Sequence, residues 1–424
     1  MSRRMVFGRY DFAAFGVFIA YAVGSLAVPT ALVQVAESLN FPLDGGGMAE
    51  GGWLHMLRSL ALTASMLTCG FMAARWGNRK PLGFSVLLIG FGMVLCAVAP
   101  HYGFLVGALI IAGFGEGIVE GLATPFVQRL HLDEPGRYVN FSHAFWSIGV
   151  VIATVLFGAL LALGVSWRII MLVAGLFTVP PALLLMLPER KKHYPENNNK
   201  FSAKEVLGQT ADICKTPQFW LYFAAMFLAG GGEFCLTFWG TRFIQLELAG
   251  NAMTGGIGLA TFATGMFLGR TGFGFFIHQR HLKRLLLSTG ALAVLASMLI
   301  PWIAYTAGLA SGRITEPLAW LPPLPLATYI HQVGALYIVL FITGIGTAPF
   351  WPSIQSRAVE QMPRLDATMV FVLLSCAGFP GCGYFSLLMG YAGGIVGLTL
   401  SFFLVPVSFL VMTFLILMDG RRCV

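Results

Sequence analysis

The chain has 424 residues, of which 57% are hydrophobic and only 10% are charged, and its mean hydropathy is +0.79. Soluble globular proteins carry about 25% charged residues, so this chain could not cover itself with a polar surface in water. The composition therefore excludes a soluble protein and predicts one that crosses a membrane many times. In a soluble protein the net charge of +8 would suggest a nucleic-acid partner. In a membrane protein it can instead come from lysine and arginine in the cytoplasmic loops.

The apolar segments predict twelve membrane spans. A span needs about 20 mostly apolar residues. The first apolar stretch follows the basic residues MSRR, is long enough to span and lacks a small-residue cleavage site, so we predict a span there and not a signal peptide. The predicted spans cover residues 12–36, 53–74, 81–100, 103–127, 142–164, 167–187, 219–241, 253–277, 284–306, 331–355, 367–390 and 394–418.

One long polar segment divides these spans into two sets of six. It covers residues 188–218 and contains the run ERKKHYPENNNK. We therefore predict an all-α polytopic membrane protein with an N-terminal six-helix bundle over 1–187, a linker over 188–218 and a C-terminal six-helix bundle over 219–424.

The distribution of lysine and arginine predicts the orientation of the chain. If the N-terminus is cytoplasmic, most of the 26 basic residues fall in cytoplasmic segments, whereas only Arg168, Arg242 and Arg313 fall on the opposite side and Arg58 and Arg270 lie inside spans. Cytoplasmic loops are enriched in Lys and Arg. We therefore expect both termini and the linker in the cytoplasm, and the positive charge indicates no nucleic-acid partner.

The loop after the second span carries a motif. Residues 70–82 read GFMAARWGNRKPL, and a partial echo, GRTGFGFFIHQRHLKR, covers 269–284 in the second half. The motif resembles the loop signature of the major facilitator superfamily, although Ala74 replaces its usual Asp. The resemblance implies two six-helix halves related by a pseudo-two-fold axis, with Arg75 and Arg79 as charge-pairing or gating residues.

Further stretches resemble the fucose–proton symporter family, in order through both halves. They are EGLATPFV from residue 120, GRYVNFSHAFWSIGV over 136–150, GGEFCLTFWGTRF over 231–243, FLGR over 267–270 and GIGTAPFWPS over 344–353. This resemblance implies a secondary transporter of the cell (inner) membrane that uses alternating access. It also implies a small-molecule substrate and protons as partners, and a monomer embedded in the lipid bilayer.

Two glutamates one helical turn apart stand out in the fourth span. Placing a charge at this depth costs at least about 2.5 kcal/mol, so Glu116 and Glu120 are candidates for function. A buried carboxyl can take up a proton on one side and release it on the other. The resemblance implies this proton-coupling role for Glu120. Glu116 has no counterpart in the family pattern, and it is either a second proton site or part of a polar cavity lining.

Other polar and aromatic residues predict a substrate cavity. Glu233 follows three glycines that could loosen the seventh span, and Trp239 lies two turns on, where it either stacks on a sugar or belongs to the aromatic belt. Asn140 and Trp146 lie on one stripe at the start of the fifth span. His143 lies between them and could be a cap or interface residue.

The two arginines inside spans need partners. Buried Arg270 must find a carboxylate or carbonyls, and Glu120, Glu116 or Glu360 could serve. Arg58 either extends toward the outer surface or lines the cavity, where it would favour an anionic solute.

The sequence predicts no enzyme. It contains no phosphate-binding glycine loop with its lysine, no nucleophile–base pair and no metal-ligand spacing, so we expect neither ATP use nor a metal or cofactor. The seven cysteines lie in apolar spans or at cytoplasmic positions and predict no disulfide. The leading hypothesis is proton-coupled symport of a monosaccharide or similar small polar solute. The alternatives are an exporter or organic-anion carrier and, in another class, a transporter-like receptor without net flux.

Overall fold

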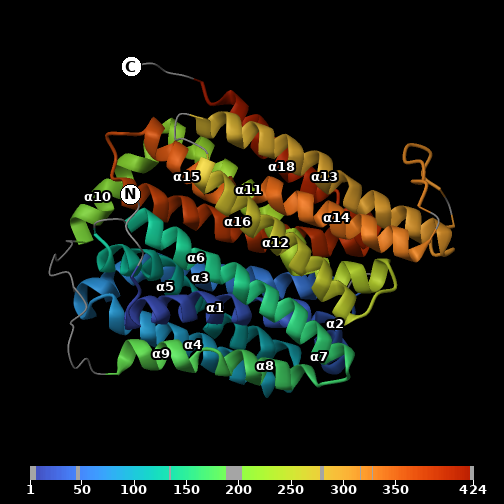
Figure 1. Ribbon diagram of the computed structural model, residues 1–424, viewed down its shortest axis with the longest axis horizontal. Coiled ribbons are helices and arrows are strands. Elements are labelled where there is room, and N and C mark those ends of the chain that lie inside the picture. Colours follow the sequence, from blue (N-terminus) through green and yellow to red (C-terminus); the bar gives the residue numbers. More distant parts are fainter. Residues whose placement is uncertain are drawn as a thin grey trace.

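The computed structural model describes residues 6–43, 48–132, 135–187, 203–276, 281–315, 317–326 and 328–420, leaving out the side chains of residues 71, 74, 135–137, 140, 203–206, 274–276 and 368. Every regular element in these ranges is a helix (Figure 1). They are α1 Arg9–Thr30, α2 Leu32–Leu39, α3 Met48–Trp76, α4 Arg79–Ala97, α5 Tyr102–Leu130, α6 Pro135–Val151, the π-helix η2 Ile152–Leu156, α7 Phe157–Ala162, α8 Trp167–Leu176, α9 Val179–Met186, α10 Ala203–Cys214, α11 Pro217–Glu247, α12 Ala252–Phe276, α13 Leu282–Ala310, α14 Tyr329–Thr347, α15 Phe350–Gln361, α16 Ala367–Val396, α17 Leu398–Ser401 and α18 Leu404–Met418.

Eleven segments of the described chain are long and apolar enough to cross a membrane, one fewer than the twelve predicted. The difference is α3, which is 29 residues long but carries polar residues such as Glu50, His55 and Arg58. α3 packs against α5 and α16, and His55 and Arg58 are buried. Burial between helices allows a spanning helix to be less apolar than one that faces lipid.

Several predicted spans consist of two consecutive helices. The first span divides at Ala31, two residues after Pro29, and the tenth divides near Pro349. Pro lacks the N–H of a helical hydrogen bond, which explains breaks at these positions. Pro125 and Pro380, by contrast, lie within the continuous helices α5 and α16.

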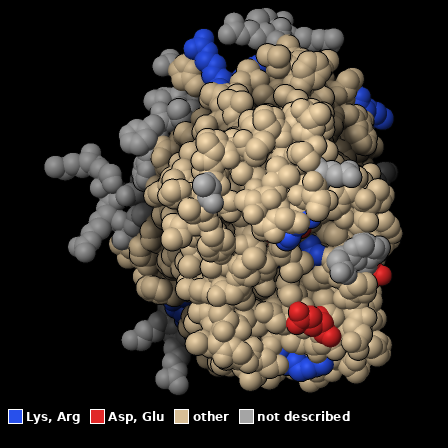
Figure 2. Space-filling view, turned by 90° about the vertical axis from the view of Figure 1, so that its right-hand side faces the viewer, with Lys and Arg blue, Asp and Glu red and all other residues tan. Residues whose placement is uncertain are grey.

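The helices form two layers (Figure 1). Helices up to α9 pack mainly on one another, as do those from α11 onward, and the halves meet where α3 contacts α16 and where α6, η2 and α7 contact α12. The start of α1 and the end of α18 lie at one end of the bundle (Figure 1). We call the opposite end, which carries α2 and α7, the distal end. Charged side chains are sparse on the distal end (Figure 2). The exact boundaries at 187 and 219 stay a prediction.

The two halves repeat one detail of helix capping. At the start of α4, Arg79 donates to the Leu185 carbonyl at the end of α9, with N and O 2.8 Å apart. At the start of α13, Lys283 donates to the Leu417 carbonyl at the end of α18 over 3.2 Å. In each half, a basic residue at the start of the third span thus caps the end of the sixth. A positive charge is favourable there because the C-terminus of a helix is partly negative. This repetition fits two related six-helix units.

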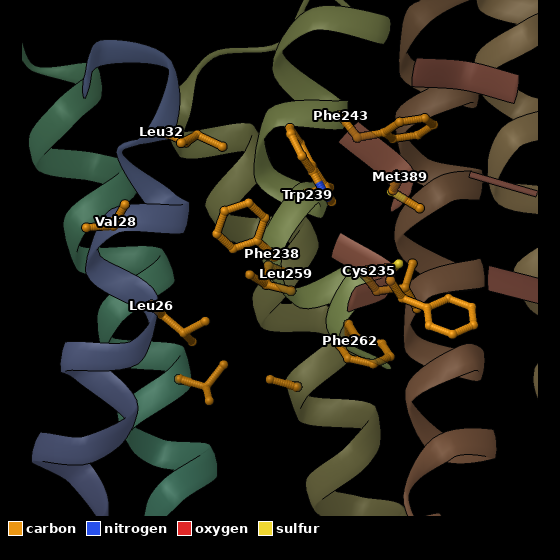
Figure 3. Close-up of a cluster of buried hydrophobic side chains, with 14 of the residues drawn as sticks. Leu26, Val28, Leu32, Cys235, Phe238, Trp239, Phe243, Leu259, Phe262 and Met389 are labelled. Atoms are coloured by element: carbon orange, nitrogen blue, oxygen red, sulfur yellow. The ribbon is translucent and has the colours of Figure 1, made fainter. Parts of the chain in front are cut away.

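The halves are in tight contact toward the distal end. A Cβ at Gly52 of α3 would lie 2.6 Å from the Leu387 Cα of α16, and one at Gly256 of α12 would lie 2.1 Å from the Thr154 carbonyl oxygen of η2. Between these contacts, Leu26 of α1 and Leu32 of α2 face the aromatic side chains of α11 and α12 (Figure 3). Backbones approach this closely only where a residue has no side chain, so the distal side is closed in this structure.

Within the first half, Gly117 gives a prediction with an internal control. A Cβ at Gly117 of α5 would lie 1.9 Å from the Leu62 carbonyl oxygen of α3, whereas Gly107 of the same helix has open space around it. Overpacking costs about 1–3 kcal/mol, so Gly117→Ala should lower the melting temperature in detergent. Gly107→Ala should leave it unchanged or raise it slightly. Equal melting temperatures for the two variants would contradict the close α3–α5 packing.

Candidate functional site

The first half contains a buried ion pair at mid-helix depth. The Arg58 Nε on α3 donates to the Glu116 Oε2 on α5 over 2.8 Å, and the Arg58 Nη2 donates to the Glu116 Oε1. Both residues are almost completely buried, with exposed fractions of 5% and 1%. Ser25 of α1 completes the cluster, since its hydroxyl donates to Glu116 over 3.0 Å and its carbonyl accepts from Arg58 over 2.9 Å. Arg58 therefore points into the protein and not toward the outer surface.

Glu120 lies one turn further along α5 in different surroundings. It is half-buried, with the Tyr21 hydroxyl of α1 beside it and the positive charge of Arg270 acting on it from the other half. The two glutamates thus share a helix face, as the sequence predicts, but they differ in their partners. Glu116 is held by two hydrogen bonds from an arginine, whereas Glu120 faces the junction of the two halves.

Arg270 of α12 lies at that junction. Its Nη2 is 3.7 Å from the Glu233 Oε1 on α11, and its Nε donates to the Ala348 carbonyl over 3.2 Å. Its guanidinium carbon lies 5.9 Å from the ring centroid of Trp146 on α6, in the first half. A carboxylate or carbonyls were expected as partners, and the nearest carboxylate is that of Glu233, which was not among the three glutamates considered. Of the three glutamates considered, Glu116 bonds Arg58 and Glu360 bonds Arg357.

Glu233 lies at the middle of α11. The three glycines before it do not interrupt this helix. They let neighbouring helices approach instead, because a Cβ at Gly231 would lie 2.5 Å from the Phe385 ring of α16. Glu233 is 2% exposed, and the Trp351 indole of α15 lies beside its carboxylate.

The two predicted tryptophans differ in exposure. Trp146 is half-buried beside Arg270, at the junction of the halves. Trp239 is completely buried, and its indole N–H donates to the Ser386 carbonyl of α16 over 3.0 Å. Figure 3 shows its ring within the apolar cluster. In the distally closed structure, therefore, only Trp146 is placed to meet a solute near Arg270.

Two further predicted residues lie outside this cluster. Arg75, near the end of α3, stacks over Trp76 with 5.6 Å between its guanidinium carbon and the ring centroid. Arg79 caps α9 as described above. Asn140 belongs to α6, but its side chain lies outside the described residues.

Several residues at the site were not identified from the sequence. Tyr21 and Ser25 of α1 contact the two glutamates, but a single Tyr or Ser in an apolar span gives no signal of its own. His143 was expected to be a cap or interface residue. Its Nε2 is 2.8 Å from the Thr124 hydroxyl of α5, close to Glu120 in sequence. The arrangement thus combines two arginine–glutamate pairs with one further carboxyl between the halves, which suits proton exchange and binding of a polar solute.

Comparison with known proteins agrees with this architecture. The sequence is 24% identical to the oxalate:formate antiporter of Oxalobacter formigenes over 218 residues, which are 50% of this chain and 46% of that relative. The match thus spans about half the length of this curated relative.

Solved structures cover nearly the whole chain. A bacterial homologue of the human lysosomal transporter Spinster, in an inward-facing and occupied conformation, superimposes with a TM-score of 0.71 at 14% identity, covering 97% of this chain and 96% of the other. The fucose:proton symporter of E. coli superimposes with a TM-score of 0.65 at 16% identity, covering 97% and 98%. At these identities the likeness shows the fold.

The family follows from the sequence match. The model of the Major Facilitator Superfamily matches residues 13–319, which is well over half of the chain and extends from the first span into the second half. Together with the two layers of spanning helices, this match shows that the chain belongs to the major facilitator superfamily of transporters.

Proposed function

We propose that this protein is a proton-coupled symporter for a monosaccharide or a similar small polar solute, working by alternating access. The observation that carries the proposal is the contrast between Glu116 and Glu120. Arg58 holds Glu116 with two hydrogen bonds, which leaves Glu120 as the carboxyl at the junction of the halves. A group there can exchange its proton with either side as the halves move.

The balance of charge favours a neutral solute. Arg58 is matched by Glu116 and Arg270 by Glu233, so the site is neutral overall when Glu120 carries a proton. Arg58 is the residue that would have favoured an anion, and Glu116 and Ser25 already take up its donors. A neutral solute entering with one proton then adds no unbalanced charge to a poorly solvated site.

Groups suited to a sugar lie around Arg270. Trp146 offers an aromatic face, Arg270 offers donors, and the Glu233 carboxylate offers an acceptor. Hydroxyl groups of a sugar can both donate and accept hydrogen bonds, which matches this set. The similar fold of the fucose:proton symporter supports the same class of solute.

The orientation and setting are part of the proposal. We infer that the chain lies in the cell (inner) membrane as a monomer, with both termini in the cytoplasm and the distal end outside. The sparse charge of the distal end supports this orientation.

Binding can be tested on the detergent-purified protein. We expect a neutral sugar from a panel of monosaccharides and small organic anions to raise the melting temperature by mass action. The effect should be larger at pH 5.5 than at pH 8, since the solute binds together with a proton. In vesicles, solute uptake should make the medium more alkaline. Stabilisation by organic anions alone would contradict symport of a neutral solute.

One observation favours a second candidate, exchange of organic anions. The Arg270 side chain keeps 30% of its surface exposed and lies 3.7 Å from Glu233, beyond hydrogen-bonding distance. A carboxylate solute could therefore replace Glu233 as its partner. The relative named oxalate:formate antiporter supports this candidate. Anion binding that is lost in Arg270→Gln, with sugars inactive in the wild type, would decide for it.

A further inference from the structure

A groove at the distal end lies apart from the site around Arg270. It is lined by residues of α3, α5 and α16, among them Glu50, Trp53, Tyr102 and Tyr391, and its volume is about 520 Å³. Trp53 and Tyr391 are 38% and 50% exposed. Tyr102 is the first residue of α5 and Glu50 lies in the first turn of α3, so the groove is at the depth of lipid headgroups.

Glu50 supplies the only carboxylate among the lining residues. Its Oε2 is shielded from solvent and has no hydrogen-bond partner within the described residues. The adjacent Tyr102 does not satisfy it, because the Tyr102 hydroxyl donates to the Glu50 backbone carbonyl over 2.8 Å. A shielded carboxylate oxygen without a donor is costly, and a positive charge held in the groove beside this carboxylate would offset that cost.

The aromatic side chains around Glu50 also favour a cation. The Trp53 indole N–H donates to the Tyr391 hydroxyl over 3.2 Å, which joins α3 of one half to α16 of the other. With Tyr102 they provide three aromatic rings around one carboxylate. Aromatic rings attract ammonium groups through their negative faces, and rings combined with a carboxylate are a recurrent way to bind them. An aromatic belt alone would need no carboxylate.

We propose that this groove binds the ammonium group of a zwitterionic lipid headgroup, such as that of phosphatidylethanolamine. Glu50 neutralises the ammonium, and Trp53, Tyr102 and Tyr391 surround it. Because the Trp53–Tyr391 hydrogen bond spans the two halves, a headgroup held there contacts both halves in the closed state. The lipid therefore stabilises the distally closed conformation, in which α3 and α16 are in tight contact.

Native mass spectrometry of the whole protein tests the site. The detergent-purified protein is incubated with equal amounts of phosphatidylethanolamine and phosphatidylglycerol of the same acyl chains, and the retained lipid is counted. We expect the wild type to retain phosphatidylethanolamine preferentially and Glu50→Gln to weaken that retention about tenfold. Glu37→Gln is the matched control, because Glu37 is an exposed glutamate of α2 outside the groove.

The remaining outcomes are decisive. Should Glu50→Gln purify poorly, Tyr391→Leu tests the same site at an exposed position, and the same loss of preference is expected. Retention equal to that of the wild type in the folded variant would overturn the proposal. Stabilisation by soluble tetramethylammonium without any lipid preference would overturn the lipid as the occupant.

Discussion

Glu120→Gln is expected to abolish accumulation of solute against its gradient in vesicles with an inward proton gradient. The accumulation ratio should fall to about one, the value without coupling between proton and solute. Glutamine keeps the size and hydrogen-bonding capacity of the side chain but cannot exchange a proton, so solute binding and solute–solute exchange should survive. Uptake of radiolabelled solute and counterflow, measured on the same vesicle preparation, separate the two effects.

The dependence of solute uptake on external pH provides a second test of the role of Glu120. Wild-type uptake should decrease as the external pH rises, because fewer carriers then bind the proton that moves with the solute. Uptake by Glu120→Gln should be independent of pH over the same range. Glu37→Gln, a change at an exposed position of α2, should behave like the wild type. Accumulation by Glu120→Gln that still depends on pH would remove Glu120 from the coupling mechanism.

Removal of one partner from the buried Arg58–Glu116 pair should have a comparably large effect, but on stability. Both side chains are at most 5% exposed, so Arg58→Met leaves the Glu116 carboxylate without its cation, and Glu116→Leu leaves Arg58 without its anion. Breaking a buried pair costs about 3–5 kcal/mol. Thermal unfolding in detergent should show a markedly lower melting temperature for each single variant.

A double variant measures how much of the lost stability comes from the interaction between Arg58 and Glu116. Arg58→Met with Glu116→Leu removes both charges at once, so its loss of stability should be smaller than the sum of the single losses. Ser25→Ala removes one hydrogen bond to Glu116 and should cost only about 1 kcal/mol. Strictly additive losses would show that Arg58 and Glu116 are not coupled, and Glu116 would then be available as a second proton site.

The sequence was sufficient to predict most of the spanning helices and the superfamily. Whether a segment can cross a membrane depends on the transfer free energy of its own residues, which is a local property. Eleven of the twelve expected spans pass the test of length and apolarity. The helix α3 misses it because it carries polar residues, of which His55 and Arg58 are buried inside the protein. The loop motif and the ordered stretches in both halves indicated the superfamily, and the match over residues 13–319 confirms it.

The partners of the charged residues could not be predicted from the sequence. Counting residues along a helix places Glu120 and Arg270 inside spans, but it does not show which residues face them. The pairing of Arg58 with Glu116 and of Arg270 with Glu233 depends on the rotation of each helix and on its neighbours. Those quantities follow from packing over the whole bundle, because many side chains together decide which faces meet.

The same limit applies to Trp239 and the glycines before Glu233. The sequence by itself determined that these residues lie in a spanning helix of a transporter, since composition and motif order are local or additive signals. Only the tertiary structure decided that Trp239 is locked against α16 and that Gly231 admits Phe385. The physical reason is that close approach between helices is a property of two surfaces, and either sequence segment alone contains only one of them.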